Sequence, residues 1–165
     1  MTHHKSPRLL VADDDLGVIA AYRLVLESSR NAAGTQDLMG LNTLENELFG
    51  TVSSHGDTLP WRVHFVDQGE DAVAAVKDAT AQGDPFAGVF LDVRMPPGID
   101  GYETAQQIRQ FDPAVHIVFV SGYSDYDSDD LIEACGTGTN LTILPKPVWP
   151  DQLRAVAAQI ATLKS

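Results

Sequence analysis

The chain has 165 residues, of which 44% are hydrophobic, and its 11 basic and 23 acidic residues give a formal net charge of −12. A chain of this length and composition suits one globular domain with its own core, and its apolar runs are too short to span a bilayer. The acidic surplus repels phosphodiester backbones and anionic lipids, which argues against direct binding to nucleic acid or to a membrane surface.

The chain opens with a tail, a strand and a helix. Residues 1–7 are expected to form an N-terminal tail. Residues 8–12 (RLLVA) are a short, continuous apolar run, typical of a strand buried on both faces. Residues 15–29 predict a helix that starts at the capping residue Asp15 and directs one apolar face inward, formed by Leu16, Ile19, Tyr22 and Leu26.

The segment 30–61 interrupts the pattern because it is too long for an ordinary connection. Its first part predicts a short helix, since leucines recur there at near-helical spacing: Leu38, Leu41, Leu44 and Leu48. Its second part, TVSSHGDTLP, is polar and rich in turn formers, which predicts a loop. We interpret the segment as an insertion whose leucines pack back onto the domain. The alternative is that they form a surface for a partner or a second copy.

Strands and helices alternate along the rest of the chain. The predicted strands are 62–66, 89–92, 116–121 and 141–144. The predicted helices are 70–81, 102–111, with Phe111 facing inward, 127–135 and 151–163. Strands that alternate with helices predict a parallel sheet, and right-handed crossovers cover both of its faces. The expected fold is therefore a doubly wound, five-stranded α/β sandwich.

Polar side chains follow four of the predicted strands where each strand ends. The first strand runs into Asp13-Asp14-Asp15, the third ends at Asp92, the fourth ends at Ser121, and Lys146 follows the fifth. If these strands are neighbours, the groups meet at the carboxyl edge of the sheet, where open parallel sheets bind ligands. Clustered carboxylates suit a hard divalent cation such as Mg²⁺. The hydroxyl and ammonium groups suit a phosphoryl group, which Asp92 is positioned to attack.

This ordered set resembles the receiver domain of two-component response regulators, which has a flavodoxin-like fold. The stretch DVRMPPGIDG at residues 92–101 is similar to the family's D-x-x-M-P-x-x-D-G loop. The resemblance runs from about residue 8 to residue 163, apart from the insertion, and predicts a receiver domain over residues 8–165. In this family a sensor histidine kinase or a histidine phosphotransfer protein donates a phosphoryl group to an aspartate on the third strand.

The resemblance implies a role for each polar residue. Asp92 corresponds to the phosphoacceptor, Ser121 to the hydroxyl residue that turns toward the phosphoryl group, and Lys146 to the lysine that pairs with a phosphoryl oxygen. It also implies four Mg²⁺ ligands: Asp14 and Asp92 directly, Asp13 through water, and the backbone carbonyl of Arg94. The bond between Lys146 and Pro147 is commonly cis in the family.

The resemblance also implies how the protein works. We expect a signalling domain rather than an enzyme, one that assists its own phosphorylation and dephosphorylation and switches a surface that binds an unknown effector. A homodimer through that surface is a further expectation. Because no apolar h-region precedes the first charges, and the single cysteine Cys135 forms no internal disulfide, we expect a cytoplasmic location.

The sequence departs from the family pattern in two places besides the insertion. The loop M-P-P-G-I-D-G is one residue longer than the usual M-P-x-x-D-G. Ile143 stands where the family often has a switching aromatic residue, so Tyr123 or Tyr126 would have to replace it. Arg94 and Tyr123 stand at positions that flank the path of hydrolytic water, which gives the hypothesis of a long-lived phosphorylated form.

Three other readings compete with a phosphorylated receiver. A phosphohydrolase with an aspartate nucleophile needs an acid two residues after Asp92, where Arg94 stands. A nucleotide-binding domain needs a glycine-rich loop after the first strand, where three aspartates stand. The main alternative is a degenerate receiver that serves only as a phosphorylation-independent docking module. The complete set of acid, hydroxyl and lysine residues in this chain argues against it.

Overall fold

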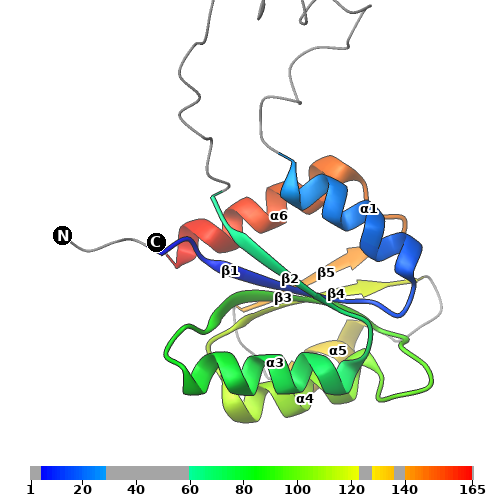
Figure 1. Cartoon of the computed structure of the whole chain (residues 1–165). Coiled ribbons are helices and arrows are strands. Elements are labelled where there is room, and N and C mark those ends of the chain that lie inside the picture. Colours follow the sequence, from blue (N-terminus) through cyan, green and yellow to red (C-terminus); the bar gives the residue numbers. More distant parts are fainter. Residues whose placement is uncertain (1–4, 29–59, 123–127, 136–139, 165) are drawn as a thin grey trace, which may run out of the picture.

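The computed structural model describes residues 5–28, 60–122, 128–135 and 140–164, which form one sheet flanked by helices (Figure 1). The strands are β1 (Arg8–Ala12), β2 (Arg62–Val66), β3 (Phe86–Asp92), β4 (His116–Ser121) and β5 (Leu141–Pro145). The helices are α1 (Leu16–Glu27), α3 (Gly69–Ala81), α4 (Gly101–Phe111), α5 (Ser128–Cys135) and α6 (Pro150–Leu163). The predicted alternation of strands and helices is confirmed for these residues.

All neighbouring strands of the sheet are parallel, in the order β2-β1-β3-β4-β5. The chain runs outward from β1 to β2 and then crosses back to β3, so the direction of winding reverses between β1 and β3. Figure 1 shows α1 and α6 on one face of the sheet and α3, α4 and α5 on the other. This arrangement confirms the doubly wound fold and places β1, β3 and β4 side by side, as the predicted site requires.

The central strand β3 is covered on both faces. All seven of its residues are buried, and the pleat sends successive side chains to opposite layers. Val89 and Leu91 join the core beneath α3 and α4, whereas Phe90 joins the core beneath α1 and α6. A parallel strand buried on both faces therefore has a continuous apolar sequence. Asp92 stands at the end of that sequence.

Three details of the predicted elements were wrong. β3 begins at Phe86 rather than at residue 89, because the two residues before Gly88 are buried and extend the strand. Leu16 is 68% exposed and Phe111 is 38% exposed, although their helical spacing placed both in the core. Both residues stand at the end of a helix, where the neighbouring layer no longer covers its apolar face.

The predicted insertion at residues 30–61 lies outside the described residues, except for its last two. Of these, Trp61 is buried, and its indole Nε1 donates a hydrogen bond of 3.0 Å to the carbonyl of Leu26 near the end of α1. The two flanks of the segment therefore lie together where β2 begins, at the opposite edge of the sheet from Asp92. None of the described helices is long and apolar enough to cross a membrane.

Candidate functional site

Four of the predicted site residues stand at one edge of the sheet, where the carboxyl ends of its strands meet. Asp13 directly follows β1, Asp92 and Ser121 are the last residues of β3 and β4, and Lys146 directly follows β5. These four residues come from four adjacent strands of the sheet. Because the strands are parallel, the four side chains stand at the same edge. The position coincides with the reversal of winding between β1 and β3, where sheets of this type bind ligands.

Asp13, Asp14 and Asp92 form an acidic cluster. One carboxylate oxygen from each residue lies within 4.8 Å of those of the other two. Asp13 is 2% exposed and Asp92 is 5% exposed, so two of the three carboxylates are withdrawn from water. Asp13 Oδ1 accepts a hydrogen bond of 2.9 Å from the backbone N–H of Asp15. Asp15 in turn caps α1, as predicted, because its Oδ1 accepts from the N–H of Gly17 at 2.8 Å.

Burial changes the proton affinity of this cluster. Desolvation is the main reason that the pKa of Asp13 rises to about 6, and the nearby charge of Asp92 adds to the rise. Desolvation also raises the pKa of Asp92, although the hydrogen bond from Lys146 opposes it. A carboxylate that is disfavoured in its charged form gains the most from an added cation. The cluster therefore fits Mg²⁺ both in its oxygen donors and in its shortage of positive charge.

Lys146 brings an ammonium group to the cluster. Its Nζ lies 2.8 Å from Oδ1 of Asp92, and its backbone N–H donates to the carbonyl of Ser121 at 2.8 Å. The bond between Lys146 and Pro147 is cis, as the resemblance implied. Ser121 is 9% exposed, and its hydroxyl donates to the carbonyl of Gly122 at 3.0 Å. The lysine thus contacts Asp92 directly, while the serine hydroxyl bonds to the backbone nearby.

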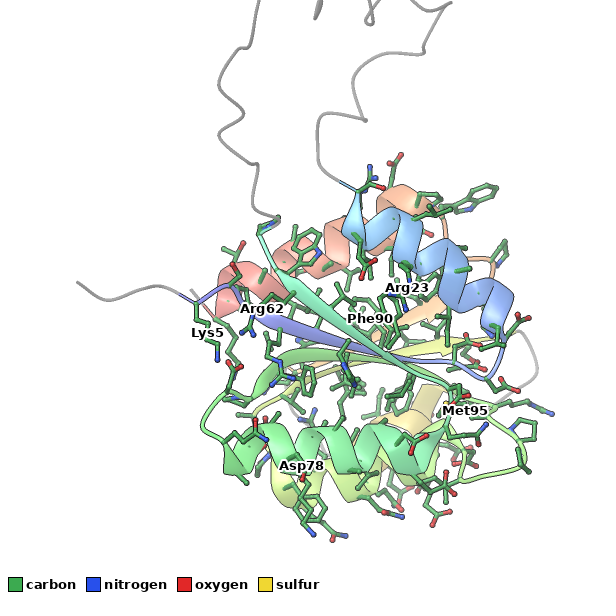
Figure 2. The ribbon with its side chains drawn as sticks, viewed as in Figure 1. Lys5, Arg23, Arg62, Asp78, Phe90 and Met95 are labelled. Atoms are coloured by element: carbon green, nitrogen blue, oxygen red, sulfur yellow. The ribbon has the colours of Figure 1, made fainter. Side chains whose placement is uncertain are left out.

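The loop after Asp92 is anchored at both ends. Near its start, Met95 is 1% exposed and belongs to the core (Figure 2). At its far end, Asp100 Oδ1 accepts a hydrogen bond of 2.8 Å from a backbone N–H in the first turn of α4. A Cβ on Gly101 would collide with the backbone carbonyl of Asp92. The Asp-Gly pair therefore starts α4 directly against the backbone of β3.

The other predicted residues are placed as follows. Arg94 lies in this loop with an exposed side chain, and a backbone hydrogen bond from it lowers the pKa of the Asp92 carboxyl group. Ile143 is half-buried on β5 and packs against the core. Tyr123 and Tyr126 lie outside the described residues.

Sequence analysis did not single out Gln68 and Glu70, which contact the same loop from the start of α3. The N–H of Gly98 donates to Gln68 Oε1 at 3.3 Å, and the N–H of Ile99 donates to Glu70 Oε1 at 3.1 Å. One signal in the sequence points to Gln68. Glutamine stands two residues before the helix predicted at 70–81 and directly before α3, at an N-cap position where Ser, Thr, Asp or Asn is preferred.

Comparisons with known proteins agree with this geometry. The model of the response regulator receiver domain family matches residues 56–158. The transcriptional regulatory protein ZraR of Klebsiella oxytoca is 29% identical over 99 residues, which are 60% of this chain and 20% of that protein. A receiver protein from Sinorhizobium medicae WSM419 has a TM-score of 0.60 and 21% identity, with 98% of both chains covered. A CheY-like receiver domain protein from Methanospirillum hungatei JF-1 has a TM-score of 0.63 and 16% identity, with 98% and 100% covered.

The family match covers more than half of the chain, which therefore belongs to the response regulator receiver domain family. Receiver domains are the signalling domains of two-component systems. The structural neighbours support the same flavodoxin-like fold. The matched range begins at residue 56, so Asp13 and Asp14 lie outside it. The pairing of β1 with β3 brings these two residues next to Asp92. The chain spans about a fifth of the length of the curated relative that it matches.

Proposed function

We propose that Asp92 accepts a phosphoryl group from a sensor histidine kinase or a histidine phosphotransfer protein. The observation that carries this proposal is the 2.8 Å contact between Lys146 Nζ and Asp92 Oδ1 beside the acidic cluster. A buried carboxylate with an ammonium group and two further carboxylates around it is suited to receive an anion together with a metal ion. In this proposal residues 8–165 form one receiver domain that carries the segment 30–61 as an insertion.

The acidic cluster would hold Mg²⁺. Asp14 and Asp92 would bind it directly, Asp13 would bind it through water, and the backbone carbonyl of Arg94 would complete the set. The bound ion supplies positive charge, which offsets repulsion between the carboxylates and the oxygens of the incoming group. The chain contributes by keeping these carboxylates close together and largely shielded from water.

The transfer itself requires mainly positioning. An oxygen of Asp92 attacks the phosphorus atom, the bond from phosphorus to the donor histidine nitrogen breaks, and that nitrogen keeps the electron pair. Lys146 stabilises the negative charge on the transferring oxygens. The acyl phosphate adds roughly −1.5 to −2 of charge, by analogy with other phosphorylated side chains. The chain thereby assists its own phosphorylation, and the same groups would assist the attack of water that reverses it.

Ser121 would convert the new charge into a change of surface. Its hydroxyl, which donates to Gly122, would turn to a phosphoryl oxygen after transfer. This movement would bias a two-state equilibrium in the face formed by β4, β5 and α5. The altered face would bind an effector protein or domain, or a second copy of the chain.

Intact mass spectrometry after incubation with acetyl phosphate and Mg²⁺ tests this proposal. The wild type should gain the mass of one phosphoryl group, and excess chelator should prevent the gain. Asp92→Asn should show none, because its amide is not a nucleophile for phosphorus. Asp84→Asn is a matched control, since it changes an aspartate just before the other end of β3.

The absence of a gain in folded wild-type protein that binds Mg²⁺ would contradict the proposal. That result would favour the alternative, a docking module that kept its acidic cluster and does not depend on phosphorylation. A gain that persists in Asp92→Asn would place the phosphoryl group on another residue.

A further inference from the structure

The loop between β3 and α4 is held by contacts that phosphoryl transfer does not use. Gln68 and Glu70, which we call the loop clamp, extend from the start of α3 to residues 96–99. Gly98 donates to Gln68 Oε1 at 3.3 Å, and Ile99 donates to Glu70 Oε1 at 3.1 Å. A longer contact of 3.5 Å joins Gln68 Nε2 to the carbonyl of Pro96. Two side chains therefore contact three backbone groups of the loop, at Pro96, Gly98 and Ile99.

Gln68 makes these contacts at the expense of its own helix. It occupies the N-cap position of α3, but its side chain accepts no hydrogen bond from the first turn. Two of the other helices that start at this edge follow the usual rule, because Asp15 caps α1 and Asp100 caps α4, whereas Trp149 at the N-cap of α6 also makes no side-chain cap bond. A residue that breaks a local rule to make a distant contact is a candidate for a functional role.

Glycines on both sides allow the clamp and the loop to approach closely. A Cβ on Gly98 would collide with the carboxylate of Glu70 and would lie 2.8 Å from Gln68 Oε1. On the other side, a Cβ on Gly69 would lie 2.7 Å from Cγ1 of Ile99. The start of α3 and the loop are thus in direct contact.

We propose that Gln68 and Glu70 are positioning residues for the phosphoacceptor site. The loop that they hold starts directly after Asp92 and contains the Arg94 carbonyl, the proposed Mg²⁺ ligand. Met95 fixes the loop in the core just after that carbonyl, and the clamp fixes the next four residues. Because Met95 and the clamp hold the loop after Arg94, they would keep the Arg94 carbonyl oriented toward the acidic cluster. This inference rests on the proposed function, because it takes Mg²⁺ to bind at the acidic cluster.

Gln68→Asn tests the proposal by separating stability from positioning. Asparagine is a better N-cap than glutamine, but its side chain is one methylene shorter and loses the loop. The variant should resist urea as well as the wild type does, or better. The Gly98 amide should exchange its hydrogen faster in NMR spectra, while amides of β3 stay protected. Calorimetry should show Mg²⁺ binding weakened by about threefold to tenfold, as expected for a lost hydrogen bond.

Glu70 permits a matched pair of substitutions. Glu70→Ala removes the acceptor, whereas Glu70→Gln removes the charge and keeps an acceptor for Ile99. Glu70→Gln should therefore keep the Ile99 amide as slow to exchange and Mg²⁺ as tightly bound as in the wild type. In Glu70→Ala the Ile99 amide should exchange faster and Mg²⁺ should bind more weakly. Asp78→Asn is the control for charge on the same helix, because Asp78 is exposed and lies away from the loop (Figure 2). It should match the wild type in both measurements.

Two results would overturn the proposal while leaving the proposed function intact. One is wild-type Mg²⁺ affinity in both Gln68→Asn and Glu70→Ala. The other is an equal loss of affinity in Glu70→Gln and Glu70→Ala, which would assign the effect to charge rather than to position. A folded wild type that binds no Mg²⁺ would overturn the proposed function together with this inference. The amide exchange of Gly98 and Ile99 would then still show whether the clamp holds the loop.

Discussion

Two aspartates stand in opposite electrostatic surroundings near the two ends of β3: Asp84, just before the strand begins, and Asp92, its last residue. At the start, Asp84 forms ion pairs with Lys5 at 2.7 Å, Arg62 at 3.1 Å and Arg8 at 3.4 Å. Figure 2 shows Lys5 and Arg62 at this edge. Hydrogen bonds from Lys5 and Arg62 are the main reason that the pKa of Asp84 falls to about 2. Its charged form is stabilised, and it joins the N-terminal residues to the starts of β1 and β2.

At the other end, Asp92 is buried beside two further carboxylates, and desolvation raises its pKa despite the ammonium of Lys146. The charged form of Asp92 is therefore disfavoured. Asp84 is thus placed to stabilise the fold, whereas Asp92 is held at a cost to stability, as groups at functional sites often are.

Removing the ammonium from the functional end should have the largest effect. In Lys146→Met the apolar stem remains, but no charge stabilises the transferring oxygens. The rate of phosphorylation by acetyl phosphate should fall roughly 100-fold, a typical loss for one stabilising group. Lys77→Met, on the exposed face of α3, serves as the control and should keep the wild-type rate. A rate close to that of the wild type in Lys146→Met would show that Asp92 needs no ammonium.

Neutralising the buried carboxylate of Asp13 should make the folded protein more stable, because a disfavoured buried charge is removed. Asp13→Asn keeps an oxygen that accepts from Asp15 and loses the disfavoured charge. The rise in pKa from 3.8 to about 6 corresponds to roughly 3 kcal/mol at neutral pH, so urea unfolding without Mg²⁺ should show a gain of about 2 to 3 kcal/mol. Added Mg²⁺ should stabilise the wild type more than the variant, because the variant lacks one of the charges that favour the ion.

The pH dependence of this gain has a defined sign. A carboxyl group with a raised pKa contributes stability below its unfolded pKa of 3.8 and loses that contribution as the pH rises through about 6. The stability advantage of Asp13→Asn should therefore grow between about pH 4 and pH 6 and level off above. An advantage that is constant over this range would contradict a buried, charged Asp13.

Neutralising Asp84, near the start of β3, should lower the free energy of unfolding, and this effect should be the smallest of those predicted. Asp84 has a lowered pKa, so its contribution is present above 3.8 and is lost as the pH falls toward about 2. Because its side chain is 22% exposed and solvent screens the pairs, Asp84→Asn should cost about 1 kcal/mol at neutral pH and less in high salt. Equal stability of Asp84→Asn and the wild type would show that the cluster contributes nothing.

The functional end could be predicted from the sequence because it depends on local rules. Residues 8–12, 62–66 and 116–121 are strands with the predicted bounds, since short runs of strand-forming residues, continuous or alternating, lie there between turn formers. Once the strands alternate with helices, their carboxyl ends meet at one edge, which brings Asp13 and Lys146 to Asp92.

The structural end and the loop clamp could not be predicted in this way. Arg8 and Asp84 are 76 positions apart in the chain, and Gly98 and Gln68 are 30 apart. Such contacts depend on strand register and on the path of a loop, which no local pattern specifies. Leu16 and similar residues at helix ends were wrongly placed in the core for a related reason. Helical spacing shows which face of a helix is apolar, but not how far along the helix the neighbouring layer covers that face.

The most direct test of this contrast is an NMR titration of the side-chain carboxyl carbons of Asp13 and Asp84, with and without Mg²⁺. We expect Asp13 to titrate near pH 6 without the ion and at clearly lower pH with it, because Mg²⁺ competes with the proton. Asp84 should titrate near pH 2 in both conditions. An Asp13 that titrates near the ordinary value of about 3.9 and does not respond to Mg²⁺ would contradict the account.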